Sequence, residues 1–169
     1  MKQIISDEYR EQNRVLHETN PHYGVSGSKW RGVVREISDW GRLPILDFGC
    51  GKQTLSKSLG PAYRVTDYDP CIPGLDTPPD PHPVLICGDV LEHIEPELLD
   101  NLLAETRRLC TRRGLFVVHL TPAKKHLPDG RNAHLIQKPK AWWSLKLIEH
   151  GFQIIKDGGE DQEAWFIVE

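Results

Sequence analysis

The segment Ile45–Thr54, which reads ILDFGCGKQT, constrains the fold of this chain more than any other segment. Apolar residues typical of a buried strand run into an acid, then into two glycines one residue apart, and then into a short helix. Glycine lets the backbone turn sharply and come close to a ligand. The segment therefore predicts an α/β protein with a nucleotide-sized pocket at the end of its first strand.

The acid in this segment indicates the charge of the ligand. Asp47 stands just before the first glycine, where a dinucleotide would place its pyrophosphate. A carboxylate repels phosphate, and the repulsion grows where the effective dielectric is low. The same carboxylate attracts an ammonium or a sulfonium group. We therefore expect a cationic ligand, of which S-adenosylmethionine (SAM) is the obvious candidate.

The hydrophobic pattern predicts helices and strands that alternate along the chain. Helices are expected over residues 6–17, 30–40, 54–59, 95–110 and 140–150. Strands are expected over residues 45–48, 63–67, 84–87, 115–120, 152–156 and 164–168. Alternating strands and helices form parallel sheets with right-handed crossovers. We expect a single α/β domain: a doubly wound, mostly parallel, Rossmann-like sheet with a C-terminal antiparallel hairpin.

A second acid is expected at the ligand, because the second strand ends in VTDYDP. An acid in that position can accept hydrogen bonds from ribose hydroxyls. Asp69 is the first choice, since it is the last acid before Pro70, and Asp67 is the alternative. Tyr68, between the two acids, is also expected at the cofactor.

These motifs, taken together, resemble those of class I SAM-dependent methyltransferases of the small-molecule branch. The resemblance rests on DFGCG, on the acid about twenty residues later and on VLICGDVLEHI, and it extends from Ile45 to the C-terminus. It implies that the acid of the second strand holds ribose and that the end of the fourth strand faces the methyl group. The cofactor-binding residues it implies are Asp47, Phe48, Gly49, Cys50, Gly51, Asp69, Asp89 and Val90.

The chain departs from this family pattern in two places. Lys52 and Gln53 stand where a third glycine often follows, so Lys52 is expected to narrow the loop or to lie near the carboxylate of the cofactor. The third α/β unit is missing, because the 14 residues between Asp69 and Val84 include six prolines and cannot form a helix. A loop of this length can just make a parallel crossover. We expect an abbreviated sheet, and an adenine pocket that the proline-rich loop closes or that opens to solvent.

Two histidines are the expected catalytic residues. His93 lies in DVLEHI, one turn past the strand over residues 84–87 (the fourth strand of the family pattern), and His134 lies in the loop KKHLPDGRNAHLIQKPK. Each can serve as a general base for an oxygen or nitrogen nucleophile, and His134 can also bind the substrate. The structural alternatives are that His93 orders the start of a helix and that His134 pins the loop. A loop this long is usually functional, and we expect it to cover the acceptor.

Further contacts are expected from this loop and from the N-terminal region. Lys124, Arg131 and Asn132 are polar donors on the loop and are expected to contact the substrate. Residues 1–41 are expected to form a helical segment that caps the site, with Tyr23 at the cofactor, and residues 42–169 to form the SAM-binding domain. The alternatives are that the loop has no functional role and that Tyr23 only anchors a turn.

Composition limits the partners. The net charge is −3, so a nucleic acid is not the expected partner, and no segment is long and apolar enough to span a membrane. The N-terminus has neither a signal nor a transit pattern, which favours a cytoplasmic location. The four cysteines lack metal-ligand spacing and are read as buried thiols. No metal centre is expected, and the acceptor is expected to be a small molecule or a glycan.

Three other functions stay open on the sequence alone. A SAM-binding module without turnover fits the small size and the missing α/β unit. Cleavage of SAM by water or by intramolecular attack would use the same cofactor motifs. An NAD-dependent dehydrogenase is the third alternative, because GCGKQT loosely fits the dinucleotide pattern, but Asp47 argues against it.

Overall fold

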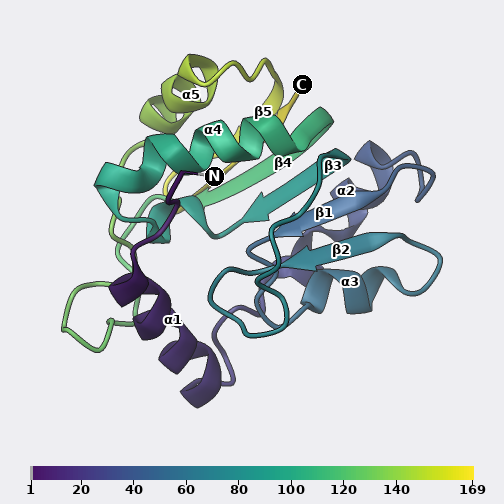
Figure 1. The fold of residues 1–169 in the computed structure, drawn as a ribbon. Coiled ribbons are helices and arrows are strands. Elements are labelled where there is room, and N and C mark those ends of the chain that lie inside the picture. Colours follow the sequence, from purple (N-terminus) through teal and green to yellow (C-terminus); the bar gives the residue numbers. More distant parts are fainter. Residues whose placement is uncertain (1) are drawn as a thin grey trace.

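A computed structural model describes residues 2–169, and their strands form one six-stranded sheet in the order β2-β1-β3-β4-β6-β5 (Figure 1). The strands are β1 (Ile45–Phe48), β2 (Val65–Tyr68), β3 (His82–Gly88), β4 (Cys110–His119), β5 (Ile154–Gly159) and β6 (Glu163–Val168). Strands β2, β1, β3 and β4 pair in parallel, whereas β6 pairs antiparallel with β4 and with β5. The expected mostly parallel sheet with a C-terminal antiparallel pair is confirmed.

Helices cover both faces of the sheet (Figure 1). They are α1 (Asp7–Thr19), α2 (Arg31–Ile37), α3 (Thr54–Leu59), α4 (Leu99–Leu109) and α5 (Lys140–Glu149), with 3₁₀ turns η1 (Gly27–Trp30), η2 (Leu91–His93) and η3 (Pro96–Leu98). Alternate side chains of a strand point to opposite faces, and β4 shows the result. Phe116 and Val118 pack in one cluster with α4 and α5, whereas Leu115 and Val117 pack in another with α2 and α3. The doubly wound arrangement is therefore confirmed.

The sheet is abbreviated at the edge formed by β2. This strand pairs only with β1, and the chain then crosses β1 to reach β3 on its other side. Residues 69–81 make the crossover without a helix or strand, as their proline content predicts. Turns hold this loop, including a hydrogen bond from the Asp69 N–H to the Leu75 carbonyl (2.9 Å). The expectation that the third α/β unit is missing is confirmed.

Strand β4 is longer than the sequence suggested. Its expected start was Leu115, but the strand begins at Cys110, directly after α4. Parallel pairing with β3 begins at that residue, opposite His82, and satisfies the backbone groups that a loop would leave to solvent. Gly114 lies within the strand, where an added Cβ would come within 3.0 Å of Val168.

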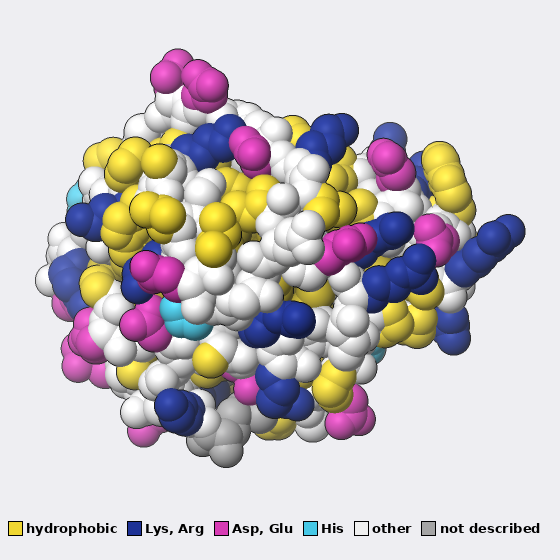
Figure 2. Space-filling view, turned by 90° about the horizontal axis from the view of Figure 1, so that it is seen from above, with side chains coloured by type: hydrophobic (Ala, Val, Ile, Leu, Met, Phe, Trp, Pro, Cys, Tyr) yellow, Lys and Arg dark blue, Asp and Glu magenta, His cyan; other side chains and the backbone are white. Residues whose placement is uncertain are grey.

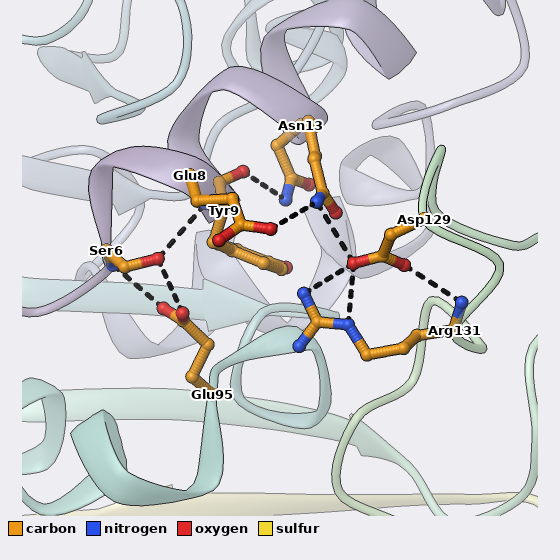
Figure 3. Close-up of polar contacts among 8 residues, drawn as sticks. Ser6, Glu8, Tyr9, Asn13, Glu95, Asp129 and Arg131 are labelled. Carbon is orange, nitrogen blue, oxygen red and sulfur yellow. Dashed lines mark hydrogen bonds and ion pairs between the residues drawn. The ribbon is translucent and has the colours of Figure 1, made fainter.

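Helix α1 is attached to two distant parts of the chain (Figure 3). Ser6 caps the helix by accepting the Tyr9 N–H (3.1 Å), and its own hydroxyl and N–H donate to the two carboxylate oxygens of Glu95 (2.5 and 2.8 Å). One turn further, the Gln12 amide donates to Asp129 (3.0 Å) in the loop that follows β4.

Within residues 2–169, no helix is long and apolar enough to cross a membrane.

Candidate active site

A cavity of about 430 Å³ lies at the carboxyl ends of the parallel strands. Its walls come from the loops after β1, β2 and β3, from α1 and the segment that follows it, and from residues 120–139, here called the β4–α5 loop. Ligands in open α/β sheets bind at such ends, where the strand order reverses, and here it reverses between β1 and β3. The volume falls within the range of about 300–1,000 Å³ that is usual for small-molecule sites.

The loop after β1 requires glycine at two positions. Gly49 and Gly51 have φ angles of +79° and +51°, which other residues rarely adopt. A Cβ on Gly49 would lie 2.3 Å from Val90, and one on Gly51 would lie 2.6 Å from the Gly24 carbonyl oxygen. The backbone of this loop therefore packs closely against two other segments that line the cavity, as the sequence motif indicates.

Asp47 carries an uncompensated carboxyl group in the cavity wall. Its side chain is buried, with 6% of the residue exposed, and no hydrogen bond or ion pair reaches it from residues 2–169. Burial raises the pKa of Asp47 to about 8, and the neighbouring charges of Asp67 and Asp69 act in the same direction. A cation in the cavity would favour the ionised form of Asp47, against burial and the charges of Asp67 and Asp69. The surroundings of Asp47 are therefore consistent with the cationic ligand that its position in the sequence indicates.

The two acids considered for the ribose, Asp67 within β2 and Asp69 directly after it, have different surroundings. Asp69 lines the cavity and accepts the backbone N–H groups of Gly51 (3.1 Å) and Cys71 (2.9 Å). Burial raises the pKa of its carboxyl group, and these two hydrogen bonds partly offset the shift. Asp67 does not line the cavity; Gln53 (3.0 Å) and Ser56 (2.9 Å), at the start of α3, both donate to its Oδ2. Of the two acids considered, only Asp69 can meet a ligand in this cavity.

Two residues expected at the cofactor lie outside the cavity lining. Lys52 donates from its ammonium to the His17 carbonyl near the end of α1 (2.7 Å), because unsatisfied carbonyls at a helix C-terminus attract cations. The Tyr68 ring packs on Phe48, and the Tyr68 carbonyl accepts the N–H groups of Gly49 and Cys50 (2.8 and 3.1 Å). The structure therefore gives both residues a supporting position. Phe48, Cys50, Asp89 and Val90, which were also expected at the cofactor, line the cavity.

Helix α1 supplies three cavity-lining residues that the sequence did not single out. Tyr9, Asn13 and His17 recur every four residues, which places them on one side of the helix, and all three line the cavity. The Tyr23 hydroxyl, which lies in the expected place, donates to the Asn13 side chain (2.7 Å). His17 lies 3.8 Å from Asp69. The four-residue spacing was visible in the sequence, but nothing local showed where the helix docks.

His93 and His134 lie together at the other end of the cavity, with ring centroids 4.9 Å apart. The Nδ1 atom of His93 lies 2.8 Å from the Ala133 carbonyl, and that of His134 lies 2.6 Å from the Thr121 carbonyl. A carbonyl only accepts, so Nδ1 carries the proton in both rings and Nε2 keeps its lone pair. Burial lowers the pKa of both histidines, that of His93 to about 3 with the help of His134. Both imidazoles are neutral at ordinary pH.

A group of carboxylates surrounds these histidines. Glu92 is fully buried; its Oε1 accepts the His119 N–H (3.0 Å), and its Oε2 has no partner within residues 2–169. Burial and the nearby Asp89 raise the pKa of Glu92 well above its usual value. Asp89 has a φ of +56°, and its Oδ1 lies 3.7 Å from His119 Nε2. His119 stacks on His134 and lines the cavity.

The β4–α5 loop covers the cavity, but its polar side chains divide into two groups. Lys124 lines the cavity. Arg131 pairs instead with Asp129 (2.7 Å), outside the cavity lining (Figure 3). Asn132 accepts from the Ala123 N–H (2.9 Å) and donates to the carbonyl of the same residue (2.8 Å), also outside it. The expectation that Arg131 and Asn132 contact substrate does not match this arrangement, because local loop contacts occupy both.

The four cysteines are free and buried, as the sequence analysis expected. Their depth raises the pKa of each thiol, which keeps them in the unreactive protonated form. Cys50 and Cys71 line the cavity and contribute apolar surface to it.

No protein-family model and no curated protein matches the chain. Solved structures do match its fold. The 1,6-didemethyltoxoflavin-N1-methyltransferase of Burkholderia thailandensis, solved with 1,6-didemethyltoxoflavin and S-adenosylhomocysteine, is 14% identical at a TM-score of 0.69; the match covers 95% of this chain and 88% of that one. Magnesium protoporphyrin IX methyltransferase of Synechocystis, with S-adenosylhomocysteine, is 17% identical at a TM-score of 0.57, covering 96% and 94%.

A third solved structure, mitomycin 7-O-methyltransferase, is 15% identical at a TM-score of 0.62, and the match covers 92% of this chain and 60% of that one. At such identities the likeness concerns the fold. The chain has the class I, Rossmann-like fold of SAM-dependent methyltransferases, with the third α/β unit removed.

Proposed function

We propose that this protein transfers a methyl group from SAM to an oxygen or nitrogen nucleophile of a small-molecule or glycan acceptor. The observation that carries the proposal is Asp47, a buried carboxyl group with no partner within residues 2–169, in the wall of a cavity large enough for a nucleoside. An unpaired buried acid is unstable unless a cation meets it. SAM brings an ammonium group, and it supplies a methyl group on a sulfonium, which a nucleophile can accept without a metal or redox step.

The residues around Asp47 suit the rest of this cofactor. Gly49 and Gly51 bring the backbone close enough to hold an amino-acid tail beside Asp47. Each Asp69 oxygen accepts one backbone N–H, and a carboxylate oxygen has a second lone pair for a ribose hydroxyl. Pro70 and Cys71 of the proline-rich loop line the cavity beyond Asp69, where we place the adenine. Asp89 and Val90 are then the residues nearest the methyl group.

The same acids argue against a dinucleotide. Asp47 and Asp69 both line the cavity, and Asp67 lies near enough to raise the pKa of Asp47. A pyrophosphate would add negative charge to this group in a poorly solvated place, which is strongly unfavourable. The dehydrogenase alternative is therefore the weakest of those that the sequence left open.

The acceptor belongs at the histidine end of the cavity. The polar groups there include the Nε2 lone pairs of His93 and His134 and the ammonium of Lys124, and helix α1 with Tyr23 closes the cavity from the other side. We propose that residues 1–41 act as this cap. A small acceptor is supported by the enclosing walls and by relatives in fold that act on a toxoflavin precursor, mitomycin and magnesium protoporphyrin.

A nucleic-acid acceptor has less support. The face formed by α4 and α5 mixes lysines and arginines with acids and exposed apolar side chains, among them Leu145 and Ile148, and carries no continuous basic stripe (Figure 2). A nucleic-acid groove combines a basic track with stacking aromatic side chains.

Calorimetry with SAM, S-adenosylhomocysteine and NAD tests the cofactor. We expect both sulfur compounds to bind one site in the micromolar range or tighter and NAD not to bind. Binding of NAD without binding of SAM would refute the proposal.

Incubation with labelled SAM tests the reaction. We expect SAM alone to stay intact and label to move to an acceptor from a panel of hydroxylated and aminated metabolites. Breakdown of SAM without any acceptor would favour the cleaving enzyme, and intact SAM with every acceptor would favour the binding module.

A further inference from the structure

We propose that Glu92, His93 and His134 form a binding site for one divalent transition-metal ion beside the acceptor. Each of the three offers one ligand atom, and these atoms all lie within 4.8 Å of one another. Ligands that bind one tetrahedral ion at about 2.1 Å each lie about 3.4 Å apart, so the side chains need to close by at most about 1.4 Å. Rotamer adjustments supply movements of that size.

The two histidines are already oriented as metal ligands. Each donates its Nδ1 proton to a backbone carbonyl, His93 to Ala133 and His134 to Thr121. This is the arrangement that fixes the tautomer and the ring plane of a metal-binding histidine and leaves Nε2 free to bind. Both carbonyls belong to the β4–α5 loop, so one loop fixes the orientation of both imidazole rings.

Glu92 supplies an independent observation. One of its carboxylate oxygens is fixed by the backbone N–H of His119, and the other, Oε2, is fully buried without a partner among residues 2–169. A buried polar atom without a partner is costly, and such atoms in a native fold call for an explanation. An ion shared with the two imidazoles satisfies this oxygen, and the hydrogen bond on Oε1 holds the carboxylate in place for it.

A second cluster nearby is less suited to an ion. Asp89, His119 and Glu163 also bring their ligand atoms within 4.8 Å of one another. Lys29 already neutralises Glu163 through contacts of 2.6 and 2.8 Å, and the cluster is partly open to solvent. We therefore assign the ion to the buried set.

The donor set indicates the kind of ion. Two imidazoles with one carboxylate suit Zn²⁺, Fe²⁺, Mn²⁺ or Co²⁺, whereas Mg²⁺ prefers oxygen ligands. His93 and His134 line the cavity and Glu92 lies behind them, so the remaining coordination positions face the cavity. Within the proposed function, an oxygen of the acceptor would occupy such a position, and the ion would lower the pKa of a hydroxyl group there, its proton leaving to water.

No metal was expected from the sequence, because the three ligands have no diagnostic spacing. Glu92 and His93 are adjacent, and His134 lies far along the chain on a loop. The site arises only when the β4–α5 loop folds back over the end of β3, with the Ile136 N–H on the Glu92 carbonyl (2.9 Å).

The test is calorimetric titration of the chelator-treated full chain with Mn²⁺, Co²⁺ and Mg²⁺. We expect one site for Mn²⁺ and Co²⁺, and affinity at least about tenfold lower for Mg²⁺. Glu92→Gln and His134→Ala should each weaken Mn²⁺ binding by at least about tenfold. His82→Ala, which removes a partly buried histidine at the far end of β3, is the matched control and should leave it unchanged.

Visible absorption of the Co²⁺-loaded wild type gives a second readout that needs no variant to fold. We expect ligand-field bands with a stoichiometry of one ion per chain. Absence of Mn²⁺ and Co²⁺ binding to the wild type, equal affinity for Mg²⁺, or unchanged affinity in folded Glu92→Gln would overturn the metal site. SAM binding, measured separately on the metal-free chain, tests the proposed function, so failure of one proposal is distinguishable from failure of the other.

Discussion

The two ends of the cavity are built in different ways. At the cofactor end, the loop after β1 and the end of β2 bring acids together, and Asp47 is left without a counter-charge. At the acceptor end, His93, His134 and Glu92 are each tied to the backbone by one atom and keep one atom free. The cofactor end therefore favours a ligand with a positive charge, whereas the acceptor end presents lone pairs in fixed directions.

The largest effect is expected at the cofactor end, from Asp47→Asn. The substitution keeps the shape of the side chain and removes the charge that attracts the ammonium group. Removing one partner of a buried ion pair costs about 3–5 kcal/mol, so SAM affinity should fall by at least about 100-fold in calorimetry. Asp67→Asn is the control, because Asp67 does not line the cavity, and it should lose less than about tenfold.

The same substitution should stabilise the ligand-free protein. The pKa of Asp47 is raised to about 8 in the folded state, so the folded state binds more protons than the unfolded state between about pH 4 and pH 8. The free energy of unfolding therefore falls as the pH rises through this window. Asp47→Asn should exceed the wild type in melting temperature at pH 8 and match it near pH 4. Equal melting temperatures at pH 8 would contradict the unpaired-acid account.

The next effect separates backbone strain from close packing in the glycine loop. Gly51→Ala places a Cβ 2.6 Å from the Gly24 carbonyl, whereas Gly60→Ala, also at a positive φ, meets open space. Strain alone costs about 1–3 kcal/mol. Urea unfolding should show Gly51→Ala to be the more destabilised, and only Gly51→Ala should weaken SAM binding. Equal losses in the two variants would show that the contact with Gly24 does not matter.

A smaller effect is expected from the attachment of α1. Ser6→Ala removes the helix cap and the contacts of the hydroxyl with Glu95, which should cost about 1–2 kcal/mol in thermal unfolding. SAM affinity should fall by less than about tenfold, since α1 still covers the cavity. Thr19→Ala, at the other end of the same helix, loses an exposed hydroxyl bond and should change stability by less than about 0.5 kcal/mol. A larger loss from Thr19→Ala than from Ser6→Ala would refute the role of the cap.

The smallest effect concerns a residue that the sequence analysis expected at the substrate. Arg131 pairs with Asp129 on the surface, and exposed pairs contribute about 0–1 kcal/mol. Arg131→Ala should leave SAM binding and Mn²⁺ binding within about twofold of the wild type. A loss of turnover in Arg131→Ala with unchanged binding would return this residue to the acceptor site.

The two ends also differ in how far the sequence revealed them. The glycine loop, Asp47 and Asp69 follow directly from local patterns, because the end of a strand fixes where the next few residues lie. The abbreviated sheet followed from proline content, which is a local property too. Only the ends of strands and helices differ from the predicted ranges. Pairing with β3, for example, starts β4 at Cys110 and not at Leu115.

The acceptor end depends on contacts between residues far apart in the chain, which local patterns do not specify. The partner of His134 is the Thr121 carbonyl and that of Glu92 is the His119 N–H. Asn132 was expected to contact the substrate because it is polar, yet in the folded loop its side chain accepts the Ala123 N–H. The docking of α1, which brings Tyr9 to the cavity, is equally non-local.

The most direct test of the central claim is the number of protons released when SAM binds at pH 7, from calorimetry in buffers of different ionisation enthalpy. Asp47, with a pKa of about 8, is mainly protonated in the free protein and must ionise to meet the ammonium group. The account predicts release of about one proton by the wild type and almost none by any binding that persists in Asp47→Asn. Tight SAM binding without proton release in the wild type would contradict it.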